Sequence, residues 1–152
     1  MNLKFLFSVL NILILCVIIA TVSIFVVNNT FWIGPAMLML AILCVVSLVP
    51  FKVNIKEILP DIIFGVIDNG ILAIFAIFGA HFAGVAGAII GGVVGNSVTD
   101  GIAGIFEGHT AERLRLRAVL EERTMLKSSV GKMAGCLLGA GLILIANSII
   151  KF

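Results

Sequence analysis

Two aspartates inside apolar stretches are the residues of this sequence whose type and position could do chemistry. Asp68 lies within the apolar residues 60–82, and Asp100 lies within the next apolar stretch, residues 85–107. An aspartate at the centre of a membrane-spanning helix costs about 2.5–3.5 kcal/mol on the insertion scale. Because such residues usually face a helix-bundle interior or a water-filled path, we start from the expectation that both are functional.

Helical spacing places further polar residues beside these two. Asp61 is seven residues before Asp68, and Asn96 is four residues before Asp100, so each pair shares one helix face. Glu107 follows Asp100 by seven residues and falls on approximately the same face.

A turn near Gly84 would bring the two faces to matching depths. Asp68 and Asp100 each lie sixteen residues from Gly84, and Asp61 and Glu107 each lie twenty-three residues from it. In an antiparallel hairpin, we therefore predict two levels of paired carboxylates, about 10 Å apart at a rise of roughly 1.5 Å per residue. Four carboxylates in apolar surroundings would repel each other unless a cation or protons intervened.

The predicted site is a set of hard oxygen ligands, which suit manganese, magnesium or ferrous iron better than copper or zinc. We expect the cation as a substrate and predict no resident cofactor. The candidate metal ligands are Asp61, Asp68, Asn96, Asp100 and Glu107, with Asn69 as a further neutral neighbour.

Each carboxylate of this set has a simpler interpretation. Asp61 follows Pro60 in a first helical turn, where an acid suits the helix dipole. Glu107 could be an interfacial charge, and Asp68 and Asp100 could form a protonated, hydrogen-bonded pair that holds two helices together. The sequence contains no Ser–His–Asp order, phosphate-binding loop or dinucleotide fingerprint, so we do not expect an enzyme.

Composition defines the elements that must hold these residues. The chain has 152 residues, of which 61% are hydrophobic and 12% are charged, and its mean hydropathy is +1.27. A soluble domain is typically about half apolar and a quarter charged. The composition therefore excludes a soluble globular domain and a disordered tail, and a net charge of +2 gives no argument for a nucleic-acid partner.

We predict an all-α integral membrane protein with a single membrane domain over residues 1–152, since a span needs roughly 20 residues. Lys and Arg gather in three segments that fall on one side of a five-span arrangement, which places the N-terminus in the cytoplasm. A charged amphipathic helical segment, residues 109–127, follows a helix stop at Gly108 on that side. The five predicted spans are residues 5–27, 31–49, 60–82, 85–107 and 130–150, approximately.

Glycines recur every four residues in the last two spans, at Gly87, Gly91, Gly95 and at Gly131, Gly135, Gly139. Faces without side chains let helix backbones approach closely in a membrane. We favour packing between helices of the same chain. A homo-oligomer, such as a dimer, is a compatible second interpretation.

The segment from Asp61 to Gly70 resembles the first helix of the vacuolar iron transporter family, with an Asp, a Gly four residues on and a second Asp three after that. The glycine- and alanine-rich residues 83–92 and the charged segment after them extend this resemblance over residues 60–127. The sequence departs from the family in having two spans before this pair and no methionine within it. The resemblance implies a five-span dimer that moves ferrous iron or manganese out of the cytosol in exchange for protons, with Asp68 on the metal path.

Together, these patterns predict a multi-pass membrane transporter for a cation, a divalent metal such as iron or manganese, that is coupled to protons. The expected partners are the lipid bilayer and either a second copy or other membrane subunits, without nucleic acid. The alternative is a small structural or assembly subunit of a larger membrane complex, with the glycine faces as docking surfaces. A third interpretation is a proton-conducting element.

Overall fold

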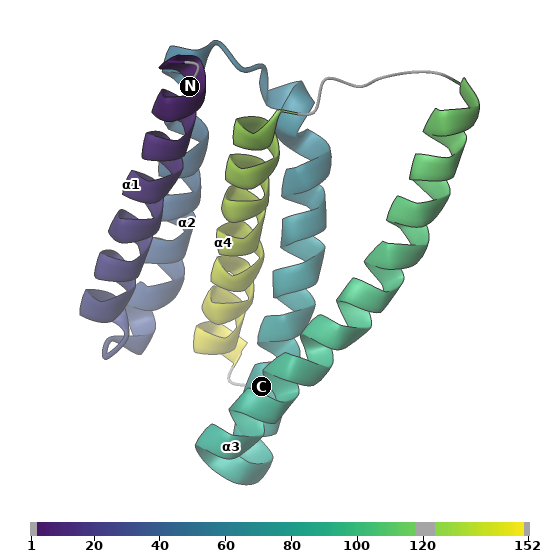
Figure 1. Cartoon of the computed structure of the whole chain (residues 1–152). Helices are drawn as coiled ribbons and strands as arrows, with labels where there is room; N and C mark the ends of the chain where they lie inside the picture. Colours follow the sequence, from purple (N-terminus) through teal and green to yellow (C-terminus); the bar gives the residue numbers. More distant parts are fainter. Residues whose placement is uncertain (1–2, 118–123, 151–152) are drawn as a thin grey trace. The chain divides into compact units, whose positions relative to one another are not determined.

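The structure is a computed structural model that describes the backbone of residues 3–117 and 124–150, and the side chains of these residues except 30 and 106–117 (Figure 1). Every regular element in these ranges is helical, which confirms the all-α prediction. The elements are α1 (Leu3–Val26), α2 (Thr30–Val46), the short 3-10 helix η1 (Val49–Phe51), α3 (Ile55–Arg117) and α4 (Met125–Ile150).

Four helical stretches are long and apolar enough to cross a membrane, as judged by length and composition. They cover Leu3–Val26, Phe31–Phe51, Ile55–Ile105 and Met125–Ile150. The third is one element in which the two predicted spans 60–82 and 85–107 follow each other. Charged side chains are rare along these stretches, as expected for helices that are able to cross a membrane.

The chain divides into two compact units. The first contains Met1–Gly70 and Thr124–Phe152, and therefore holds α1, α2, the first part of α3, and α4. The second contains Ile71–Arg123 and holds the rest of α3.

In the first unit, α4 packs between α2 and the first part of α3. A Cβ added to Gly141 would lie 3.0 Å from a methyl carbon of Leu38 on α2. On another face of α4, a Cβ added to Gly131 would lie 3.2 Å from the carbonyl oxygen of Ile58 on α3. These close approaches require glycine, because any side chain would push the helices apart.

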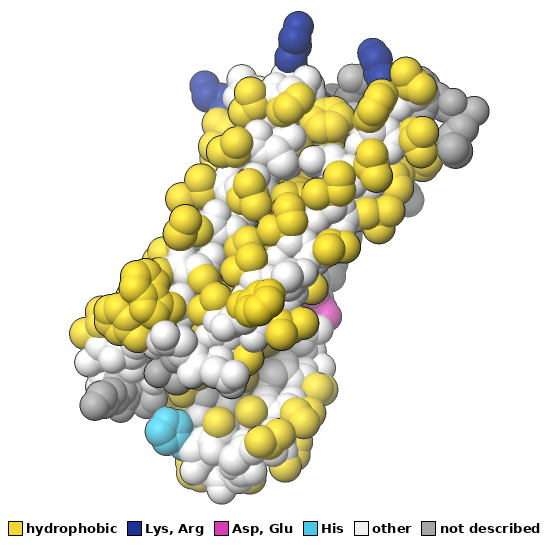
Figure 2. Space-filling view, turned by 90° about the vertical axis from the view of Figure 1, so that its left-hand side faces the viewer, with side chains coloured by type: hydrophobic (Ala, Val, Ile, Leu, Met, Phe, Trp, Pro, Cys, Tyr) yellow, Lys and Arg dark blue, Asp and Glu magenta, His cyan; other side chains and the backbone are white. Residues whose placement is uncertain are grey.

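The core of the first unit lies where α2 ends and where α3 and α4 begin. Its buried side chains come from all four helices: Leu15, Cys44, Leu48, Ile58, Leu126, Val130 and Ala134. The Lys side chains that the structure describes also belong to this unit, at Lys4, Lys52, Lys56, Lys127 and Lys132. Figure 2 shows Lys side chains at the top of the view, above a surface on which hydrophobic side chains are numerous.

Helix α3 begins at Ile55, earlier than the predicted start at residue 60. Asn54 explains the difference, because its Oδ1 accepts a hydrogen bond from the Lys56 backbone N–H at 3.0 Å. This side chain satisfies one of the backbone donors that a helix start leaves unpaired. Pro60 consequently lies inside the helix, where it removes one backbone hydrogen bond, and not at the first helical position as predicted.

The second unit is a helical hairpin. Helical geometry is interrupted at Ala83 (φ −142°, ψ 24°) and Gly84 (φ 56°, ψ −133°), at the turn predicted near Gly84. A Cβ added to Gly79 would collide with the carbonyl of Gly87. A Cβ added to Gly95 would lie 2.9 Å from the Cα of Leu72, so the two arms run antiparallel in close contact.

The predicted helix stop at Gly108 is wrong. The backbone of α3 continues through this residue to Arg117, so the predicted charged segment 109–127 begins as an extension of the same helix. A glycine inside a helix costs only about 1 kcal/mol relative to alanine, and the helix-forming residues around it can offset that cost. Residues 118–123 of the predicted segment lie outside the described residues.

Candidate functional site

Polar side chains of the first unit gather along the contact between α3 and α4, which we call the polar seam. The two helices run parallel here, because Gly131 lies beside Ile58, Gly135 beside Ile62 and Gly139 beside Val66. Residues that are far apart in the sequence are therefore matched level by level. The members of the polar seam are Glu57, Asp61, Phe64, Asp68 and Asn69 of α3, and Lys127, Ser128, Lys132 and Cys136 of α4.

Glycines on both helices make the seam narrow. A Cβ on Gly65 of α3 would lie 2.7 Å from the backbone nitrogen of Cys136 and 2.8 Å from the carbonyl oxygen of Lys132. A Cβ on Gly135 of α4 would collide with the carbonyl of Ile62. Because the backbones nearly touch, the side chains that flank these glycines are held close to the opposite helix.

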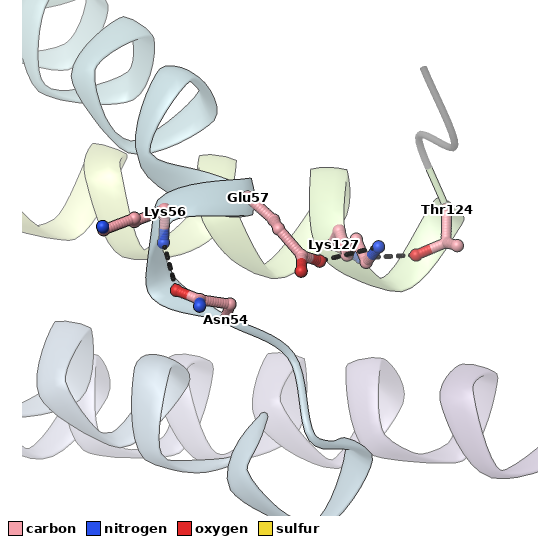
Figure 3. Close-up of polar contacts among 5 residues, drawn as sticks. All are labelled: Asn54, Lys56, Glu57, Thr124 and Lys127. Carbon is pink, nitrogen blue, oxygen red and sulfur yellow. Dashed lines mark hydrogen bonds and ion pairs between the residues drawn. The ribbon is translucent and has the colours of Figure 1, made fainter. Parts of the chain in front are cut away.

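The first level of the seam lies at the N-terminal ends of both helices (Figure 3). Lys127 Nζ and Glu57 Oε2 form an ion pair at 2.7 Å, and Thr124 Oγ1 accepts the Lys127 backbone N–H at 3.4 Å. The pair is partly exposed, at 21% for Lys127 and 46% for Glu57, so we expect it to contribute less than about 1 kcal/mol. The 2.7 Å distance shows that the two helix starts lie at the same level.

Asp61 forms the second level and is 3% exposed. Its Oδ1 accepts a hydrogen bond from the Ser128 hydroxyl at 3.4 Å. Gly131 lies next to it, since a Cβ on that glycine would be 2.9 Å from the Asp61 Cβ. Burying a carboxyl group costs free energy unless hydrogen bonds or charges compensate, so this position requires partners such as Ser128.

Lys132 forms the third level. Its Nζ lies over the ring of Phe64, 5.2 Å from the ring centroid. An ammonium at this distance is attracted to the negative face of the ring, by about 0.5–1 kcal/mol when exposed and about 2 kcal/mol when desolvated.

Asp68, Asn69 and Cys136 form the fourth level. The Asn69 amide nitrogen donates to the Cys136 sulfur at 2.7 Å and to Asp68 Oδ2 at 3.3 Å. One amide therefore links a carboxylate to a thiol across the two helices. All three side chains are partly buried.

Hydrogen bonds described for Asn96, Ser97 and Thr99 of the second unit lie within their own helix. The Asn96 amide nitrogen donates to Asp100 Oδ2 at 2.8 Å, and both side chains belong to α3. The Ser97 hydroxyl donates to the Val93 carbonyl at 2.8 Å, and the Thr99 hydroxyl donates to the Asn96 carbonyl at 3.0 Å. Asp100 itself is exposed.

The predicted ligand set is divided between the units. Asp61 and Asp68 belong to the first unit, whereas Asn96 and Asp100 belong to the second, and the Glu107 side chain lies outside the described side chains. Among the described residues, there is no group of three or more His, Cys, Asp and Glu side chains that could hold a metal ion. The paired levels across the hairpin stay a prediction.

Sequence reasoning missed the contribution of α4. It treated the last apolar stretch as a glycine-packed helix and sought no partner there for Asp61 or Asp68. The available signal was the spacing of Ser128, Lys132 and Cys136, which recur every four residues and therefore share one helix face. Lys132 is also a cation near the start of an otherwise apolar stretch.

Comparison with known proteins gives no family for this chain. Neither a protein-family model nor a curated protein nor a solved structure matches it. We therefore infer function from the chemistry of the polar seam, which combines three carboxyl groups, an amide, a hydroxyl, a thiol and two ammonium groups. Groups of these types bind cations or exchange protons.

Proposed function

We propose that this chain is a multi-pass membrane protein that transports a cation along the polar seam, with Asp61 and Asp68 as the carboxylates that hold it. The observation that supports this most is the burial of Asp61 within an apolar helix, beside the Ser128 hydroxyl. Ionisable residues at such positions are expensive to insert and mark ion or proton paths by default.

The order of the seam suits a stepwise path. Glu57 is partly exposed at the end where α3 and α4 begin, and Asp61 follows it by one helical turn. Asp68 lies two turns farther on, about 10 Å deeper at the rise of an α-helix. A cation that entered beside Glu57 would meet a carboxylate at each of these levels.

The orientation that fits this path has the N-terminus in the cytoplasm. The described Lys side chains of the first unit lie at or near the starts of α1, α3 and α4 and in the link after α2. Basic residues are enriched on the cytoplasmic side of membrane proteins. Five spans follow if each arm of the hairpin in the second unit crosses the bilayer, and the entrance beside Glu57 then faces the cytoplasm.

The chemistry favours a hard divalent cation or a proton. Carboxylate, amide and hydroxyl oxygens suit Mn²⁺ and Fe²⁺, and small divalent cations retain several waters when the protein supplies few ligands. Asp61 and Asp68 lie at separate levels, so each would hold such an ion with few protein groups. Protons need only one carboxylate at a time and are the other candidate.

The interpretation as a structural or assembly subunit is less well supported. It depends on glycine faces that are available for docking. Gly131, Gly135 and Gly139 pack against α3 within the first unit, and Gly87 and Gly91 pack within the hairpin. Any oligomer would therefore use other surfaces.

Flux measurements in liposomes test the proposal. We expect purified protein to carry Mn²⁺ or Fe²⁺ into vesicles, and we expect Asp61→Asn and Asp68→Asn to abolish this flux. Asp100→Asn tests whether the second unit takes part: retained flux would confine the path to the polar seam, and lost flux would support the predicted pairing of Asp68 with Asp100. Helix content and unfolding midpoints show that each variant is folded.

Two outcomes distinguish the interpretations. Proton flux without metal flux, lost in the same two variants, would identify the cation as a proton. A folded wild-type protein that moves neither metal nor protons would refute the proposed function.

A further inference from the structure

Exposed lysines gather at one end of the first unit. Lys4 lies in the first turn of α1, Lys52 directly follows η1, and Lys56 lies in the first turn of α3. The Asn11 amide nitrogen donates to the Ser47 hydroxyl at 3.2 Å, so the start of α1 lies beside the end of α2 (Figure 1). All three lysine side chains are exposed.

The charges described at this end do not cancel. Lys127 forms its ion pair with Glu57, so these two charges compensate each other. Among the side chains that the structure describes in the first unit, Glu57 is the exposed carboxylate, whereas Asp61 is buried and Asp68 is half-buried. The three exposed lysines therefore leave this end with a net positive charge among the described side chains.

Exposed hydrophobic side chains lie next to these lysines. Leu3 and Phe5 flank Lys4 in α1, and Ile55 precedes Lys56 in α3; each of the three hydrophobic side chains is more than half exposed. Lysines at a membrane surface extend their ammonium groups towards the headgroups while apolar side chains contact the acyl chains. A phospholipid with an anionic headgroup matches both parts of this surface, whereas a soluble anion matches only the charge.

Lys52 adopts a backbone conformation that is uncommon for lysine. Its φ of 55° and ψ of 32° lie in the left-handed region, where a Cβ is disfavoured. Its backbone N–H donates to the Val49 carbonyl at 3.0 Å and thereby closes the turn. Because glycine suits the same conformation, the charge of this side chain can be removed without straining the backbone.

We propose that Lys4, Lys52 and Lys56, which we call the lysine rim, bind the headgroups of anionic phospholipids. This binding does not depend on the proposed transport. With the proposed cytoplasmic N-terminus, the rim faces the leaflet that carries anionic lipids, and each lysine near that surface adds to the attraction. If these lysines served only to orient the chain during insertion, the folded protein would not distinguish headgroups.

Lipid titrations of the purified full chain, followed by native mass spectrometry, test this binding. In nonionic detergent, we expect phosphatidylglycerol to bind on the order of tenfold more tightly than phosphatidylcholine with the same acyl chains. The triple variant Lys4→Gln, Lys52→Gln, Lys56→Gln should lose this preference. Equal affinities of the two lipids for the wild type, or an unchanged preference in a folded triple variant, would overturn the inference.

Lys52→Gly separates the charge from the fold. We expect its unfolding midpoint in detergent to stay level or rise, because glycine suits the φ of 55°. Its preference for phosphatidylglycerol should fall by roughly threefold. Lys132→Gln is the control, since it removes one charge at the deeper level of Phe64 and should keep the full preference. Equal losses in these two variants would overturn the placement of the site at the rim.

Glycerophosphoglycerol, the same headgroup without acyl chains, distinguishes a lipid from a free phosphate ester. We expect it to bind far more weakly than phosphatidylglycerol, because the exposed hydrophobic side chains of the rim then have no acyl chain to contact. Binding as tight as that of the intact lipid would identify a site for soluble anions and would overturn the assignment to a phospholipid.

Discussion

Both units pack glycines closely against a neighbouring helix, but their aspartates have hydrogen-bond partners of different origin. In the first unit, α3 and α4 are parallel, and Asp61 is bonded to Ser128, 67 residues away in the sequence. In the second unit, the arms are antiparallel neighbours in the sequence, and Asp100 is bonded to Asn96 on its own helix. Close backbone approach is therefore common to both units, whereas the bond described between an aspartate and another helix lies in the polar seam.

The seam glycines should give the largest effect on stability. Gly135→Ala places a Cβ against the carbonyl of Ile62, so we expect the free energy of unfolding in detergent to fall by about 2–3 kcal/mol. Gly70→Ala is the control, because a Cβ there meets no atom within 4 Å. That variant should be neutral or gain up to about 1 kcal/mol from helix propensity. Equal losses in the two variants would contradict the close contact of α3 with α4.

The turn of the hairpin should give the next largest effect. Gly84 has a φ of 56°, which disfavours residues that carry a Cβ. We expect Gly84→Ala to lower the free energy of unfolding by roughly 2 kcal/mol. Gly101→Ala lies in open space on the same helix and should not be destabilising. If proteolysis of the Gly84→Ala variant begins within residues 71–105, the result would support the division into two units. Cleavage that begins in α4 would argue against it.

The cap of α4 should give the smallest effect. Thr124→Ala removes the acceptor for the Lys127 backbone N–H, and we expect a loss of about 1 kcal/mol in the free energy of unfolding. Thr124→Ser keeps the hydroxyl and should restore most of this loss. Hydrogen exchange in the first turn of α4 should increase in the alanine variant but stay unchanged around Gly84. A change spread over both regions would argue against independent units.

Local patterns in the sequence predicted the local structure well. The apolar runs predicted the all-α fold, and the break near Gly84 was predicted as a turn, where its φ of 56° suits a residue without a Cβ. The start of α3 was misplaced because Pro60 suggested a helix start, whereas Asn54 provides the side-chain cap. The stop at Gly108 was wrong because one glycine costs a helix only about 1 kcal/mol relative to alanine, which is too little to end it.

The polar seam could be predicted only in part. Spacing along one helix placed Asp61 and Asp68 on one face, since that relation depends on helix geometry alone. It could not show that Ser128, Lys132 and Cys136 lie opposite, because the sequence does not specify which apolar helices become neighbours or whether they run parallel. The hairpin argument therefore looked for partners in the adjacent helix, although the partners found in the first unit belong to α4.

The pairing of α3 with α4 also determines when, during translation, the polar seam can form. Ser128 is made 67 residues after Asp61, so the ribosome must complete the whole hairpin before the Asp61 hydrogen bond can form. At about 5–20 residues per second, this delay lasts on the order of 3–13 s. During that interval, the nascent chain holds α1, α2 and α3 without the helix that provides Ser128. Delivery of α4 is thus the step that completes the polar seam and commits the nascent chain to its final packing.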